Sequence, residues 1–162
     1  MIRFNKARLV GVRLVVLSFV LAAFTGLSAQ NDTTFVANGN PIIKYKYVGD
    51  PAAMVHDGKV YIYGRHDECP PPNGHYLINE WCVFSSPDLK TWTEHPVPLK
   101  AKDFSWAKGK AWASQVIERD GKFYWYVTVE HKMIPGKSIG VAVSDSPVSV
   151  LQSLIICWVS NG

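Results

Sequence analysis

The sequence has no acidic residue before position 30, no surplus of either charge after it, and only three cysteines. Of its 17 lysines and arginines, Arg3, Lys6, Arg8 and Arg13 precede position 30, and the other 13 balance 13 aspartates and glutamates. Nucleic-acid binding requires positive charge facing phosphates, so the neutral remainder of the chain is not expected to bind nucleic acid. The hydrophobic fraction of 48% excludes a disordered chain, because it can supply an apolar core.

The basic start leads into an apolar run from Leu14 to Leu27, which is followed by the small residues Ser28 and Ala29. The run is shorter than the about 20 apolar residues that span a bilayer, and no charged stop-transfer segment follows it. This order is typical of a secretory signal peptide. We therefore expect residues 1–29 to be removed, and the mature protein to be secreted or periplasmic and not attached to the membrane.

The cysteines are Cys69, Cys82 and Cys157. An exported protein can form disulfides, so Cys69 and Cys82 could pair. Alternatively, Cys82 is a buried thiol, because it lies in the apolar run from Trp81 to Phe84. The cysteine spacing matches no zinc pattern.

No part of the mature chain shows the 3.6-residue period of a helix, and the strongest internal signal is a repeat. Asp57-Gly58 and Asp120-Gly121 lie 63 positions apart, each between two runs rich in β-forming residues. Asp-Gly between such runs predicts a hairpin, because glycine adopts positive φ at little cost. Tyr61 and Tyr63 recur at the same offset, and their alternation places each pair on one face of a strand.

A second, weaker sequence similarity follows each hairpin, where Ser86-Pro87 and Ser146-Pro147 lie 60 positions apart. Antiparallel units that repeat in this way predict an all-β fold, a β-propeller, although a sandwich with two similar hairpins is the alternative. Residues 30–39 form a short lead-in, and residues 40–147 hold only about two blades. Residues 148–162 are an atypical tail, which is either a non-native final segment of a truncated chain or a divergent closing strand.

Two polar positions are candidates for function. Asp50-Pro51 enters the first strand of the first unit, where a carboxylate could project into a central cavity, although Asp-Pro is more often a turn. His66 ends the second strand of the same hairpin and is followed by Asp67 and Glu68. This cluster could line a sugar pocket, hold a metal ion or simply belong to a polar loop that leaves the strand.

The motifs follow one another in a recognisable order. They are Asn40-Pro41, Gly49-Asp50-Pro51, the first Asp-Gly hairpin, the segment Val83–Trp92 and the segment Ala111–Val116. In this combination the chain resembles glycoside hydrolase family 43, and the resemblance covers most of the mature chain.

The resemblance implies a five-bladed β-propeller that hydrolyses arabinose- or xylose-containing plant polysaccharides and oligosaccharides with inversion. Asp50 matches the general base, and Trp112 matches the residue that lines the sugar pocket. Ser114 stands where the family commonly has proline, so the backbone there is expected to differ. The implied specificity is that of an α-L-arabinofuranosidase or a β-xylosidase.

Two family residues have no counterpart here: the general acid and the aspartate that modulates its pKa. Glu94, Glu118 and Glu130 are interpreted as solvated residues at strand edges. No cofactor is expected; calcium occurs in some members of the family, but no ligand set identifies it in this chain. We therefore expect a truncated, inactive part of a glycosidase, with a non-catalytic carbohydrate-binding propeller remnant as the alternative.

Overall fold

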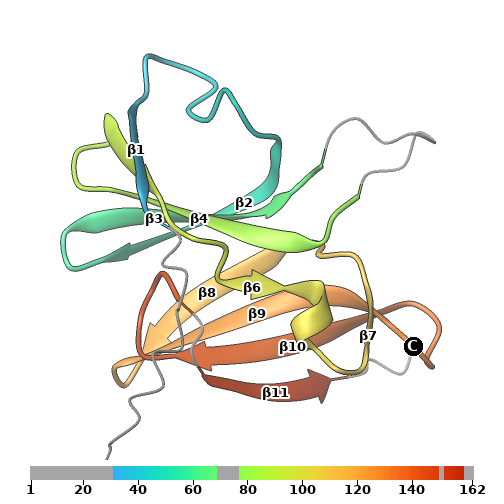
Figure 1. The fold of residues 1–162 in the computed structure, drawn as a ribbon. Coiled ribbons are helices and arrows are strands. Elements are labelled where there is room, and N and C mark those ends of the chain that lie inside the picture. Colours follow the sequence, from blue (N-terminus) through green and yellow to red (C-terminus); the bar gives the residue numbers. More distant parts are fainter. Residues whose placement is uncertain (1–30, 69–76, 150–151, 159–162) are drawn as a thin grey trace, which may run out of the picture.

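The computed structural model describes residues 31–68, 77–149 and 152–158, the last of these as backbone only. These residues form two antiparallel β-sheets stacked face to face (Figure 1), with one short 3₁₀ turn, Ala101–Asp103, in the connection between them. The all-β prediction is confirmed. The expected signal peptide, residues 1–29, lies outside the described residues, and so does Cys69.

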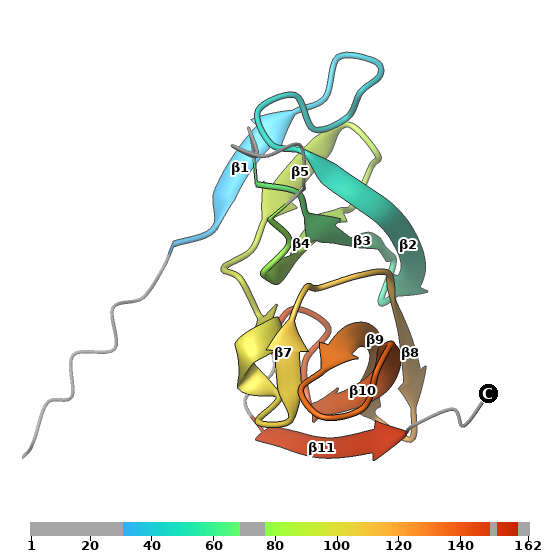
Figure 2. The ribbon, with the colours of Figure 1, turned by 90° about the vertical axis from the view of Figure 1, so that its right-hand side faces the viewer.

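The first sheet has the order β1-β5-β4-β3-β2, and β6 pairs with the start of β4. Figure 2 shows this sheet stacked above the second. Its strands are β1 (Thr33–Val36), β2 (Val48–His56), β3 (Lys59–His66), β4 (Glu80–Ser86), β5 (Thr91–Glu94) and β6 (Leu99–Lys100).

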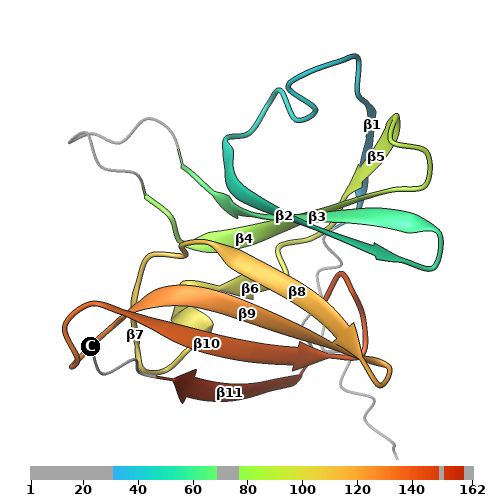
Figure 3. The same ribbon diagram turned by 180° about the vertical axis from the view of Figure 1, so that it is seen from behind.

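The second sheet has the order β11-β10-β9-β7, with β8 also pairing with β9. Strands β8, β9, β10 and β11 lie side by side in Figure 3. The strands are β7 (Ala107–Gly109), β8 (Ser114–Arg119), β9 (Lys122–His131), β10 (Lys137–Ser144) and β11 (Gln152–Trp158). Strand β11 pairs with β10 at the edge of this sheet.

Both predicted Asp-Gly hairpins are present, and they join β2 to β3 and β8 to β9. Asp57 and Gly58 have φ of 46° and 70°, and Asp120 and Gly121 have 54° and 71°. Positive φ at both central residues matches the right-handed twist of the flanking strands, which explains the Asp-Gly choice. The sequence repeat therefore corresponds to a repeat in the structure, because each Asp-Gly hairpin belongs to its own sheet of at least four antiparallel strands.

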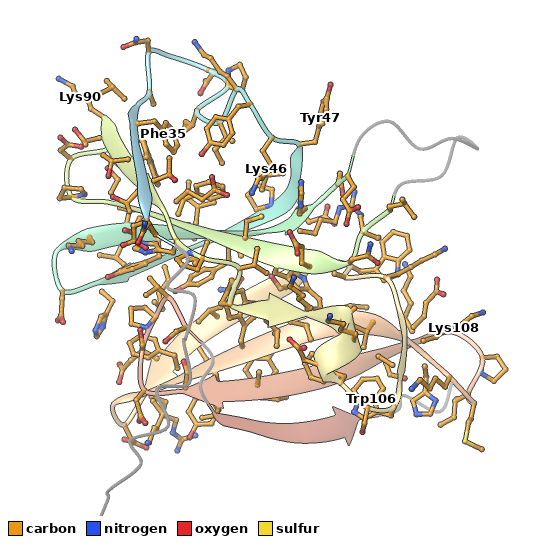
Figure 4. The ribbon with its side chains drawn as sticks, viewed as in Figure 1. Phe35, Lys46, Tyr47, Lys90, Trp106 and Lys108 are labelled. Atoms are coloured by element: carbon orange, nitrogen blue, oxygen red, sulfur yellow. The ribbon has the colours of Figure 1, made fainter. Side chains whose placement is uncertain are left out.

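The main core lies between the two sheets. Tyr63 is fully buried there, and its ring meets Trp125 edge to face at 5.0 Å between centroids. Trp81, Trp92 and Trp125 pack in the core and are at most 3% exposed, whereas Trp106 is only partly buried against it. A smaller cluster around Trp92 lies on the other face of the first sheet, covered by residues of the N-terminal segment such as Phe35 (Figure 4).

The equivalent tyrosines of the two copies have different surroundings. Tyr63 of the first sheet faces the second sheet and is completely buried, whereas Tyr126, at the matching position of the second sheet, is 38% exposed. Ile117 and Ile139 are exposed on the same face as Tyr126, because their cross-strand partners are Tyr124 and Thr128. In the part of the chain that the structure describes, this face therefore has no sheet packed on it.

The segment from Ser86 to Thr91 forms a tight turn between β4 and β5. Asp88 accepts hydrogen bonds from the backbone N–H groups of Thr91 (2.7 Å) and Lys90 (2.8 Å), and these lower its pKa. A carboxyl whose pKa is lower in the folded state stabilises the fold above its unfolded pKa, about 4. That contribution is lost as the pH falls through the folded pKa.

Above about pH 4, we expect Asp88→Asn to lower the urea concentration at which half of the 162-residue chain is unfolded. Below that pH, the difference between the two proteins should become smaller as Asp88 is protonated. Urea titrations of both proteins between about pH 2 and 6 measure the difference. A difference that does not change with pH would show that the charge of Asp88 does not stabilise the turn.

Candidate active site

Asp50 lies near the start of β2, as predicted. A β-bulge interrupts the pairing of β2 with β3 between Gly49 and Ala52, and Asp50 adopts a φ of 48° within it. Aspartate tolerates this left-handed conformation better than most residues. The bulge takes Asp50 out of the regular alternation of the strand and leaves its side chain 46% exposed. The carboxylate is therefore accessible to water and to a ligand.

The nearest charged neighbour of this carboxylate is Arg65 on β3. Its Nη1 lies 3.4 Å from Asp50 Oδ2, and its Nε lies 2.9 Å from Asp67 Oδ1. The side chain of Arg65 is only 17% exposed. One guanidinium is thus shared by two carboxylates. Arg65 was not predicted as a site residue, and Asp67 was a candidate only as part of the polar cluster with His66.

Asp67 is the buried member of this group, with 13% of its side chain exposed. Burial raises the pKa of Asp67, because it disfavours the charged carboxylate, and the neighbouring Arg65 opposes that shift. The negative charge of Asp50 adds to the rise. The charge of Asp50 therefore affects the protonation of Asp67, because both carboxylates lie beside the guanidinium of Arg65.

Trp112 reaches the same place from the second sheet. Its backbone N–H donates to Thr128 O (2.9 Å) and its carbonyl accepts from Trp81 Nε1 (2.7 Å), which fixes the residue just ahead of β8. Arg65 Cζ lies 5.6 Å from the centroid of the indole ring, so Arg65 contacts both Asp50 and Trp112. The structure thus brings the two principal predicted residues together.

The indole ring of Trp112 already has a cation over it, since Lys137 Nζ lies 3.9 Å from the ring centroid. Lys137 itself is exposed. A sugar that stacked on the same face of the ring would have to displace this ammonium, which is attracted to the indole by about 0.5–1 kcal/mol at an exposed site.

The start of β2 and the approach to β8 share one side of the molecule. Figure 4 labels Tyr47 just ahead of β2, and Lys108 in β7, which leads to β8, both on the right-hand side. The two hairpin turns lie at the opposite side (Figure 1).

His66 lies next to Arg65 on β3, so its side chain leaves the strand on the other face. Its Nδ1 is 3.0 Å from Glu80 Oε1, and Glu80 also pairs with Lys100 at 3.4 Å. The structure therefore does not bring His66 together with Asp50 and Trp112. Its assignment to substrate binding stays a prediction.

The glutamates that were interpreted as solvated lie apart from this group. That interpretation is wrong for Glu94: it accepts a hydrogen bond from Tyr45 Oη (2.7 Å) and pairs with Lys46, and its side chain is 15% exposed. Glu118 accepts from the Gly121 N–H of its own hairpin (2.8 Å), and Glu130 lies 3.5 Å from Lys110 Nζ. None of these roles resembles that of a proton donor beside Asp50.

The described residues contain no group of three or more His, Cys, Asp or Glu side chains placed to hold a metal ion. Within the same residues, no helix is long and apolar enough to cross a membrane. Cys82 is a free, buried thiol, as one of the two alternatives expected, and burial raises its pKa to about 12.

Comparison with known proteins identifies relatives that match most of this chain. The family model described as "Glycosyl hydrolases family 43" matches residues 38–153. A xylosidase/arabinosidase of Humicola insolens is 38% identical over 66% of this chain and 35% of its own length. A xylosidase/arabinosidase of Bacteroides ovatus is 37% identical over 62% of this chain and 33% of its own length. The chain thus spans about a third of these relatives.

Solved structures agree with the sequence matches. A β-xylosidase/α-arabinofuranosidase from a compost microbial metagenome, crystallised with xylotriose, has a TM-score of 0.64 and 33% identity. The similarity covers 78% of this chain and 38% of that one. The expected resemblance is therefore confirmed, and the chain that holds Asp50 and Trp112 belongs to glycosyl hydrolases family 43.

Proposed function

We propose that this chain supplies the general base of a hemicellulose-degrading glycosidase that releases arabinose or xylose from plant oligosaccharides. The observation that supports the proposal is the placement of Asp50: a half-exposed carboxylate, set in a bulge beside Trp112 and held by Arg65. The printed activities of the relatives, xylosidase and arabinosidase, support the pentose substrate.

In this role Asp50 accepts a proton from a water molecule, which attacks the anomeric carbon of the pentose. An inverting glycosidase places its base and its acid about 6.5–9.5 Å apart, so that this water fits between the base and the sugar. The exposure of the Asp50 carboxylate leaves room for such a water. No described glutamate is placed to donate the second proton to the leaving oxygen, so the general acid belongs to a further part of the propeller.

The exposed face of the second sheet supports the proposal that the general base and the general acid lie in different parts of the propeller. Tyr126 occupies the position at which Tyr63 of the first sheet is buried against a neighbouring sheet, so a third sheet would cover Tyr126, Ile117 and Ile139. A completed enzyme for assay is a chimera in which residues 31–149 of this chain are followed by the later blades of the Bacteroides ovatus relative. Hydrolysis of aryl α-L-arabinofuranosides or aryl β-D-xylosides by the completed enzyme tests the substrate class.

Trp112 is the candidate for sugar binding. In the completed enzyme, Trp112→Ala is expected to weaken pentose affinity by about 1–3 kcal/mol, because it removes an aromatic surface from a partly desolvated pocket. Calorimetric titration with xylose and arabinose measures the loss. Phe123→Leu, a change in the core away from Asp50, is the control for a loss of affinity that comes only from a destabilised fold. Unchanged pentose affinity in Trp112→Ala would leave Trp112 with a packing role only.

We also propose that the protein is exported. Residues 1–29 are expected to be absent from the mature protein, because the basic start and the short apolar run fit a signal peptide better than a membrane anchor. Intact-mass measurement of material from the periplasm or the medium checks this. Exported protein that still began at Met1 would contradict the proposal.

A further inference from the structure

Arg65 is a largely buried cation, with 17% of its side chain exposed, and its charged partners lie at the proposed site. Its guanidinium lies between Asp50 Oδ2 and Asp67 Oδ1, at 3.4 Å and 2.9 Å. The Nε atom is shielded from solvent, although its N–H does not point at the Asp67 oxygen closely enough for a hydrogen bond. A charge in such a position is tolerated only when opposite charges compensate it, so Asp67 anchors the guanidinium from the side away from Asp50.

Gly49 leaves the space that Arg65 occupies. Gly49 is the cross-strand partner of Arg65, and a Cβ atom at Gly49 would lie 2.6 Å from Arg65 Nε and 3.0 Å from Asp67 Oδ2. The backbone of Gly49 does not have the positive φ that would itself require glycine. Glycine is therefore needed at this position because of the guanidinium.

Trp112 limits Arg65 from the second sheet, with 5.6 Å between Cζ and the indole centroid. The guanidinium thus has a carboxylate on two sides and an aromatic ring on a third. A planar guanidinium with fixed neighbours keeps one orientation, whereas the half-exposed carboxylate of Asp50 would otherwise rotate freely.

We propose that Arg65 is the positioning residue of Asp50: it holds Oδ2, so that Oδ1 is presented to the attacking water. Asp67 and Gly49 act one step further away, by fixing Arg65. The inference rests on the proposed function, because positioning matters only if Asp50 is the base. Misplacing a catalytic group by about 1 Å lowers rates by up to about 100-fold, so the expected effect is on kcat.

The first test uses the 162-residue chain and measures solvent exchange of the arginine Nε–H groups by ¹⁵N NMR. The Nε–H of Arg65 is expected to exchange at least about tenfold more slowly than that of Arg119, which also faces an aspartate but is 77% exposed. Gly49→Ala and Asp67→Asn should each abolish the difference. Equal exchange of Arg65 and Arg119 in the unaltered chain would overturn the proposal.

The second test measures kcat and KM separately in the completed enzyme. Arg65→Met is expected to lower kcat by about 10- to 100-fold, with KM changed by less than about threefold, and Arg65→Lys should recover part of kcat. Gly49→Ala should lower kcat similarly, and should have no additional effect once Arg65 is methionine. Arg119→Met is the matched control and should leave both constants unchanged.

The outcomes separate the two proposals. A raised KM with normal kcat in Arg65→Met would mean that Arg65 binds sugar and does not position Asp50. Unchanged constants in Arg65→Met would overturn the positioning role outright. If instead Asp50→Asn has no effect on the completed enzyme, the proposed function fails, and the positioning role fails with it whatever the exchange rates show.

Discussion

Asp50→Asn in the completed enzyme is expected to lower kcat about 10²–10⁴-fold, because the amide cannot take a proton from water. The fold should survive the change. Asparagine, like aspartate, tolerates the φ of 48° at this position, and Arg65 keeps Asp67 as a partner. Aryl-pentoside kinetics and a urea titration of the same sample measure the two effects together.

Asp57→Asn provides the matched control for this substitution. Asp57 lies at the other end of β2, has a φ of 46° and is more exposed than Asp50, but it belongs to the hairpin turn. It should leave kcat unchanged. A completed enzyme in which Asp50→Asn keeps most of its turnover, or in which Asp57→Asn loses as much, would contradict the assignment of Asp50.

The second large effect concerns the 162-residue chain by itself, which is expected to hydrolyse no pentoside. Inverting hydrolysis needs one carboxyl group to accept a proton and another to donate one, and only the acceptor has a candidate among the described residues. The face of the second sheet that carries Tyr126 and Ile139 also meets solvent where a third sheet would pack in the completed enzyme. Loss of a general acid alone costs about 10²–10⁴-fold.

Purified 162-residue chain and the completed enzyme, assayed side by side on aryl xylosides and arabinofuranosides, test this expectation. Circular dichroism establishes that the shorter protein has its β-structure. Turnover by the folded 162-residue chain would show that one of its own side chains donates the proton. Pentose binding without turnover would favour the carbohydrate-binding alternative for the chain as it stands.

Local sequence signals were sufficient to predict the strands and hairpins. The Asp-Gly pairs specify a two-residue turn through their backbone preferences, and alternation then assigns Tyr63 to a buried face. These are short-range effects, which is why they can be recognised from the sequence alone. The position of Asp50 at the start of β2 follows from the same hairpin by counting back from Asp57.

The surroundings of Asp50 could be predicted in this way only in part. Counting pairs back from the turn places Asp50 opposite Arg65 and Gly49 opposite His66. The bulge shifts the register by one residue, so that Gly49 faces Arg65 and Val48 faces His66. No residue pattern in the sequence identified this bulge, so the position of Gly49 opposite Arg65 and the exposed, left-handed Asp50 could not be predicted.

The approach of Trp112 to Arg65 is a second feature that spacing could not reveal. The two residues lie 47 positions apart in different sheets, and they meet because the sheets stack. The family resemblance identified Trp112, whereas Arg65 became apparent only from its distances to Asp50 and Asp67. Glu94 was misjudged for the same reason, since Lys46 and Tyr45 reach it from the N-terminal segment.

The most direct test of Asp50 as the general base is chemical rescue of Asp50→Gly in the completed enzyme with azide. Glycine accepts the positive φ at this position and leaves a space where the carboxylate was. Azide in that space should attack from the side of the missing base, restore turnover, and give a pentosyl azide of inverted configuration. The unaltered completed enzyme should release its pentose with inverted configuration as well, whereas an Asp50 nucleophile would give the same azide but a pentose of retained configuration; ¹H NMR identifies both products. Absence of rescue, or a pentosyl azide of retained configuration, would contradict the account.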